Sequence, residues 1–111
     1  MASYPYPTFS KPYENYGYEA LTVTDTAAGF TAATIKPTSG DRTGIPANAA
    51  LIYVSNFPIT WRCDGTTATA ANGMHSLAND VILIEGAGNV ARFSAIRTTA
   101  DSATVYVLYY W

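Results

Sequence analysis

The sequence predicts an all-β fold: an antiparallel β-sandwich or jelly-roll-like domain preceded by an extended N-terminal arm. Short apolar and aromatic runs alternate with Gly, Pro, Asn and Asp turn signals along the 111 residues, as in small sandwich domains. No window repeats apolar residues at the i, i+3, i+4, i+7 spacing of an amphipathic helix, and Glu and Lys are scarce. We therefore divide the chain into an arm, residues 1–16, and a sandwich domain, residues 17–111.

The arm, MASYPYPTFSKPYENY, is rich in proline and tyrosine. Proline fixes φ and lacks an N–H, so this composition excludes a helix or a central strand and favours extended backbone. Disordered tails are usually poor in aromatic residues. We therefore expect the arm tyrosines to pack on the chain's own domain or on a neighbouring subunit.

Seven or so runs of the sandwich domain predict strands, each bounded by turn residues. Two segments between them, 38–48 and 66–76, predict loops because they are rich in polar, small and turn-forming residues. GAGN, residues 86–89, predicts a tight connection. The predicted strands cover residues 17–25, 30–37, 49–55, 57–63, 81–85, 90–97 and 103–111.

The run 57–63 shows the period of two that is typical of a half-buried strand. Its odd-numbered residues share one face, which we expect to point into the core. These residues are Phe57, Ile59, Trp61 and Cys63.

The last run is apolar on both faces, whereas the outer face of a sandwich strand is normally polar. We therefore expect the arm or another copy of the protein to cover its outer side. Charged residues make up only 13% of the chain, which indicates a surface that is either polar and uncharged or covered by other chains. One face carries Val105, Val107 and Tyr109, and the other carries Tyr106, Leu108 and Tyr110.

The only cysteine and the only histidine, Cys63 and His75, lie near Asp64 and raise the question of a catalytic triad. A thiol nucleophile needs a base within hydrogen-bond reach and an environment that favours the thiolate. Cys63 shares its predicted face with Trp61, which places it in the core, and His75 follows a long loop. We expect Cys63 to be a core residue, His75 a loop or surface residue, and Asp64-Gly65 a turn.

The sequence lacks the residue patterns of calcium, phosphate, zinc and nucleic-acid sites and of membrane spans. The segment after Asp64 lacks the alternating oxygen ligands of a calcium loop, and EGAGNVAR lacks the third glycine of a phosphate cradle. A single cysteine excludes an intrachain disulfide and a Cys-based zinc site. The net charge of −2 offers no basic patch for nucleic acid, and no run is long and apolar enough for a membrane span. We expect no catalytic residue, cofactor or metal, no nucleic-acid or membrane partner, and no enzymatic activity.

The span from Ala49 to Trp111 carries a sequence of structural motifs: ALIYVS, ITWRCDGTTATAANG, SLANDVILIEGAGN, RFSAIRTT and ATVYVLYYW. This order resembles the pattern of small virion proteins of tailed bacteriophages, although Thr67-Ala68 stands where that pattern often has a proline. The resemblance implies β-sandwich homo-oligomers that decorate or cement capsids, or that sit in the neck or tail.

We therefore expect a capsid decoration or cement protein on the capsid exterior, made in the bacterial cytoplasm because the N-terminus lacks a signal peptide. Its partners would be its own copies, as a dimer or trimer, and the major capsid protein. Two alternatives stay open: a tail or neck component, and a carbohydrate-binding module for host adsorption that uses exposed tyrosines such as Tyr18. The expected interface residues are Tyr4, Tyr6, Phe9, Tyr13, Tyr16, Tyr106, Leu108 and Tyr110.

Overall fold

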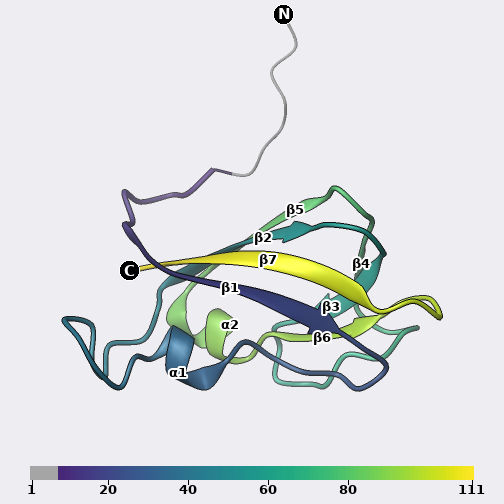
Figure 1. Ribbon diagram of the computed structural model, residues 1–111, viewed down its shortest axis with the longest axis horizontal. Coiled ribbons are helices and arrows are strands. Elements are labelled where there is room, and N and C mark those ends of the chain that lie inside the picture. Colours follow the sequence, from purple (N-terminus) through teal and green to yellow (C-terminus); the bar gives the residue numbers. More distant parts are fainter. Residues whose placement is uncertain (1–7) are drawn as a thin grey trace, which may run out of the picture.

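The computed structural model describes residues 8–111, and their strands form two antiparallel sheets that pack together as a sandwich (Figure 1). The predicted sandwich is confirmed. The four-stranded sheet has the order β1 (Asn15–Val23), β7 (Ala103–Tyr110), β2 (Ala49–Val54) and β5 (Val81–Glu85). The three-stranded sheet has the order β4 (Met74–Ser76), β3 (Ile59–Arg62) and β6 (Ser94–Arg97).

The core lies between the two sheets and is built largely from alternate residues of the longer strands. In β7 these are the residues predicted to share a face, and Val105, Val107 and Tyr109 are all fully buried. The ring of Phe93, which precedes β6, stacks on Phe30 with centroids 4.3 Å apart. Burial of this apolar surface is the main stabilising contribution to a domain of this size.

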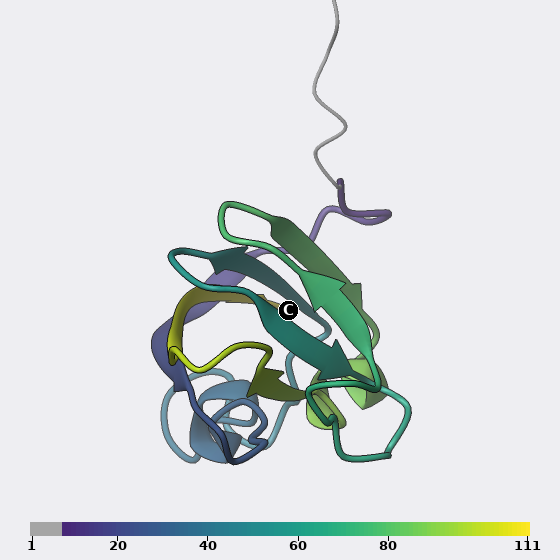
Figure 2. The same cartoon turned by 90° about the vertical axis from the view of Figure 1, so that its right-hand side faces the viewer.

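Two short helices replace parts of the predicted strands and connections. α1 (Ala32–Ile35) lies where a strand over 30–37 was expected, and α2 (Ala87–Ala91) covers most of the expected connection 86–89. The strand prediction for 90–97 is right only from Ser94 onward. Alanine, the best helix former, occupies these turns, and one helical turn is too short to show a 3.6-residue period. Figure 2 shows both helices at the lower end of the sandwich.

β4 corrects the expectation that 66–76 is entirely loop. It pairs with β3, with Ile59 opposite Ser76 and Trp61 opposite Met74. The indole N–H of Trp61 also donates to Ser76 Oγ at 3.0 Å. Three residues show no periodicity of their own, so the pairing partner decides their conformation.

The predicted inward face of 57–63 is right within β3 and wrong at its start. Ile59 is fully buried, and Trp61 and Cys63 pack against the core. Phe57, however, is 38% exposed. It lies in the corner before β3, where its N–H bonds the side chain of Asn56, so the alternation does not reach it. Within residues 8–111, no helix has the length and apolar character that crossing a membrane requires.

Candidate functional site

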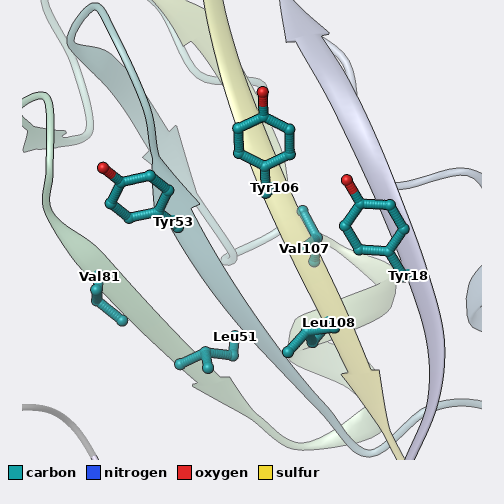
Figure 3. A pocket seen from close by; sticks show the side chains of 7 residues that line it. All are labelled: Tyr18, Leu51, Tyr53, Val81, Tyr106, Val107 and Leu108. Carbon is teal, nitrogen blue, oxygen red and sulfur yellow. The ribbon is translucent and has the colours of Figure 1, made fainter.

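Two central rows of outward side chains on the four-stranded sheet form an apolar surface, which we call the outer face (Figure 3). Residues opposite each other on neighbouring strands place these side chains in two rows. None of them is charged. The first row is Tyr18, Leu108, Leu51 and Leu83, and the second row is Ala20, Tyr106, Tyr53 and Val81.

Three tyrosines dominate the outer face. Tyr18 is 58% exposed, and Tyr53 and Tyr106 are each 40% exposed. The rings of Tyr53 and Tyr106 lie nearly parallel, with centroids 6.5 Å apart, and the Tyr53 hydroxyl donates to Asn79 Oδ1 at 2.8 Å. A shallow depression of about 280 Å³ opens between the three rings and the leucines beside them. Rigid aromatic rings over aliphatic side chains are typical of surfaces that bind another macromolecule.

The described part of the arm ends beside the outer face. Phe9 lies against Tyr110 with ring centroids 4.5 Å apart. The N–H and hydroxyl of Ser10 both donate to the carboxylate of Glu85. Tyr110 and Glu85 both lie opposite Ala49 of β2. These three residues form a further row, which adjoins the row that contains Leu108. The described part of the arm therefore covers one end of the outer side of β7, whereas Tyr106 is exposed and Leu108 is half-buried.

The expected interface residues thus fall into separate groups. Phe9 contacts both Tyr13 and Tyr110, whereas Tyr106 and Leu108 belong to the outer face. Tyr16 belongs to neither group. The guanidinium of Arg42 lies over its ring, 3.9 Å from the ring centroid. Tyr4 and Tyr6 lie outside the described residues.

Sequence reasoning missed the contributions of β2 and β5 to this surface. The run AALIYVS is apolar on both faces, as the last strand is, so Leu51 and Tyr53 could have indicated an apolar outer side of β2. Tyr18 was singled out only for sugar binding. Which strands would share a sheet could not be read from the sequence, so the joint surface was not visible.

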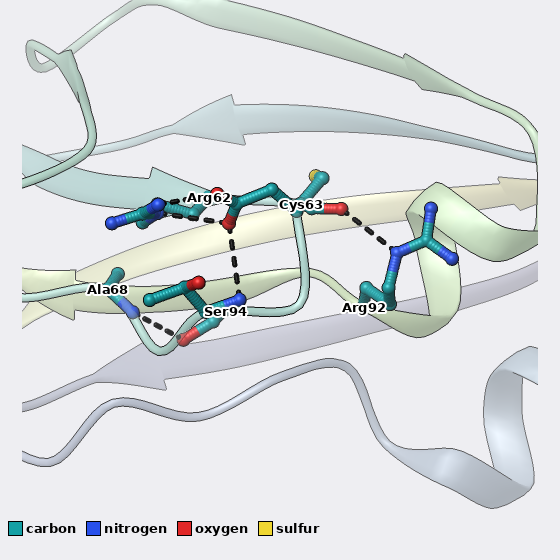
Figure 4. Close-up of polar contacts among 7 residues, drawn as sticks. Arg62, Cys63, Ala68, Arg92 and Ser94 are labelled. Atoms are coloured by element: carbon teal, nitrogen blue, oxygen red, sulfur yellow. Dashed lines mark hydrogen bonds and ion pairs between the residues drawn. The ribbon is translucent and has the colours of Figure 1, made fainter.

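The structure places Cys63 beside the core, with its backbone carbonyl turned towards Arg92 (Figure 4). Its backbone carbonyl accepts a hydrogen bond from Arg92 Nε at 3.2 Å. Burial raises the pKa of the Cys63 thiol, and the charge of Asp64 adds to this rise while that of Arg92 opposes it. A raised pKa disfavours the reactive thiolate.

Asp64 is held by its own turn. Its carboxylate forms an ion pair with Arg62 and accepts the N–H of Thr66 at 3.2 Å, which lowers its pKa to about 2. Gly65 has a φ of 89°, as the predicted Asp-Gly turn requires. His75 lies exposed on β4, opposite Thr60 of β3. The carboxylate that a triad would use to orient the histidine is therefore engaged by Arg62 and Thr66.

The two candidate regions differ in kind. Around Cys63 the side chains serve packing and a turn, and the described part of the chain holds no group of three His, Cys, Asp or Glu residues able to bind a metal. The outer face is an exposed apolar surface, which in a folded domain usually marks an interaction site. Comparison with known proteins adds no family, because no protein-family model, no curated protein and no solved structure matches the chain.

Proposed function

We propose that this chain is a non-enzymatic structural protein of a tailed-bacteriophage particle, and specifically a capsid decoration or cement protein. It would stabilise the head through contacts with its own copies and with the major capsid protein, on the capsid exterior. The observation that carries the proposal is the uncharged outer face with its three exposed tyrosines. The resemblance of residues 49–111 to small phage virion proteins is the reason for proposing a phage particle as its location.

The proposed mechanism is adhesion. An apolar surface gains about 25 cal/mol for each Å² that a partner removes from water. Tyrosine suits such a contact because its ring loses little conformational entropy and its hydroxyl tolerates a wet rim. The sparse charge of the chain, 13% of its residues, supports a protein that is surrounded by other subunits rather than by solvent alone.

The arm supports the same mechanism. Phe9 and Ser10 attach it to Tyr110 and Glu85, so a partner seated on the outer face would also meet the arm. The two surfaces together would form one continuous contact. The homo-oligomer is part of this proposal, and so is synthesis in the bacterial cytoplasm.

Replacing both Tyr53 and Tyr106 with glutamate should weaken binding to undecorated capsids at least about tenfold, because two charges would be buried without partners. Both side chains are 40% exposed, so the fold should persist. The measurement is capsid occupancy after co-sedimentation, with folding checked by circular dichroism. Leu77→Glu is the control, since Leu77 is 65% exposed and lies outside the outer face. Equal occupancy by the double variant and the wild type would contradict the proposal.

Deleting residues 2–13 should leave a folded domain that occupies capsids poorly. β1 begins at Asn15, and the backbone pair between Glu14 and Trp111 is retained. The deletion removes Phe9 and Ser10, which attach the arm beside the outer face. Occupancy and thermal stability should be measured on the same sample. A truncated protein with wild-type occupancy would refute the role of the arm.

Two other functions are distinguishable. A tail or neck component would use the same adhesion, and electron cryo-microscopy of purified particles separates it by position. A carbohydrate-binding module is favoured by one observation, the three tyrosine rings on a single sheet face, because aromatic rings stack on sugars. Sugar recognition also needs polar groups that converge on the ring, and here the Tyr53 hydroxyl is already bound to Asn79. Reproducible glycan-array binding that is lost in the double variant would favour the sugar module.

A further inference from the structure

Within residues 8–111, β1 leaves one long side of its backbone without a partner. It is the longest strand, with nine residues, and it forms an edge of the four-stranded sheet (Figure 1). β7 pairs with its other side. A bare strand edge presents a row of free N–H and C=O groups that another strand can pair with.

The register identifies which backbone groups are free. The carbonyls of Thr104 and Tyr110 accept N–H groups from Ser55 and Asn48, on the β2 side of β7. Backbone groups alternate sides along a strand, so Val105, Val107 and Tyr109 turn towards β1.

The β1 residues opposite these three are Leu21, Glu19 and Gly17, which therefore bond β7. The N–H and C=O groups of the residues between them, Tyr18 and Ala20, and of Thr22 point away from the sheet. Among residues 8–111, no hydrogen bond engages those groups on that side.

The other edge strands are shorter than β1, and some of their backbone groups are covered. A bridge from Ala28 to Ala95 covers β6, and Arg97 N–H donates to the carbonyl of Thr24 beside it. β4 is only three residues long, and the last carbonyl of β5, that of Glu85, accepts from Asn89.

Residues 17–23 of β1 contain neither Pro nor Lys, two residue types that protect sheet edges, and the bulge of the strand lies at its start, between Asn15 and Gly17. The single charged side chain there is Glu19, which turns inward and bonds Tyr109 and Thr31. The edge is therefore open to strand addition.

We propose that a second copy of this chain adds to this edge, with the two β1 strands antiparallel and related by a two-fold axis at Ala20. Ala20 then faces Ala20 of the partner subunit, and Tyr18 faces Thr22 of the partner subunit. In this register the free backbone groups of Tyr18, Ala20 and Thr22 each exchange hydrogen bonds with the residue opposite in the partner subunit. The short side chain of alanine at the axis lets the two backbones approach without obstruction.

Pairing of this kind joins two four-stranded sheets into one continuous sheet of eight strands. A two-fold axis perpendicular to a sheet keeps both outer faces on the same side, so the dimer presents twice the adhesive surface of the monomer. The inference rests on the homo-oligomer in the proposed function and names its surface, but it does not depend on the capsid as partner.

A charge exchange at residue 20 tests the pairing. Ala20 is exposed, so Ala20→Lys and Ala20→Glu should both fold. Each should raise the dimer dissociation constant at least about tenfold, because it places like charges opposite each other. An equimolar mixture should recover a heterodimer of about twice 11.9 kDa, since Lys then faces Glu. Ala91→Lys, at an exposed alanine of α2, is the matched control and should dimerise as the wild type does.

Amide hydrogen exchange distinguishes pairing of the β1 edges from association through the outer faces, because only edge pairing protects the outward amides of β1. The amides of Tyr18, Ala20 and Thr22 should gain protection as the protein concentration rises, and should lose it in Ala20→Lys. A wild type that stays monomeric, dimers unaffected by either charge, or edge amides that exchange equally at all concentrations would each overturn the inference. Capsid occupancy is measured separately: a β1-paired dimer that fails to bind capsids would refute the proposed function and leave the pairing intact.

Discussion

Replacing Ile52 with alanine is expected to lower the free energy of unfolding by about 2–5 kcal/mol. Ile52 is fully buried in β2, where it lies opposite Val107 of β7 and Ile82 of β5. Its truncation removes apolar contacts between three strands and leaves a cavity that a closely packed sandwich cannot fill by collapse. The loss is a large fraction of the roughly 5–15 kcal/mol that holds a small domain folded.

Urea unfolding followed by tryptophan fluorescence measures this loss. Ile45→Ala is the matched control, because the same atoms are removed at a side chain that is 47% exposed. We expect the control to change the free energy of unfolding by less than about 0.5 kcal/mol. Equal effects at the two positions would show that the four-stranded sheet is not packed as described.

Replacing Glu19 with alanine is expected to lower the free energy of unfolding by about 1–3 kcal/mol, because it removes the acceptor of a buried hydroxyl. Tyr109 is fully buried, and its hydroxyl donates to Glu19. The same carboxylate accepts the N–H of Thr31 at 3.1 Å and its hydroxyl at 2.6 Å. One side chain of β1 thereby joins β7 to the segment that starts α1.

Tyr109→Phe should cost less than Glu19→Ala, since the carboxylate keeps both bonds to Thr31. The two effects should not add in the double variant, because the pair shares one hydrogen bond. Thermal and urea unfolding of the four proteins measure this coupling. Strict additivity would refute a direct bond between the two side chains.

The same pair makes stability depend on alkaline pH. Burial, and then the bond to Glu19 and its charge, raise the pKa of Tyr109 far above the usual value of 10.0. A raised folded-state pKa means that the unfolded chain loses this proton first, so stability is complete below about pH 10 and falls above it. Tyr109→Phe should remove this part of the alkaline loss. An unchanged difference between variant and wild type from pH 8 to 11 would contradict the assignment.

The strands that the sequence predicts well are those with strong patterns of their own. β5 spans Val81–Glu85, as the apolar run VILIE indicates, and β7 begins at Ala103 as predicted. The two faces of β7 are also as predicted, because alternation in a strand follows from backbone geometry alone. The turn at Asp64-Gly65 was visible for a similar reason, since it is stabilised by the Asp side chain and the freedom of Gly65.

The elements that were predicted wrongly are short and depend on contacts distant in sequence. α1 holds four residues, and β4 exists because β3 pairs with it. Buried Thr60 shows the same dependence: its hydroxyl lies 2.8 Å from that of Thr98, and the loop before β4 covers its side of the sheet. No local pattern distinguishes such residues from a solvent-facing position of a half-buried strand.

The sequence by itself determined that the chain is a sandwich and that its last strand has two apolar sides, because strand periodicity and turn chemistry are local. Only the tertiary structure decided that Tyr18, Tyr53 and Tyr106 share one surface, that Phe9 packs on Tyr110, and that the outer edge of β1 is bare within residues 8–111. These features depend on which strands become neighbours. Strand order is set by the burial of the whole core, which no single segment of the sequence contains.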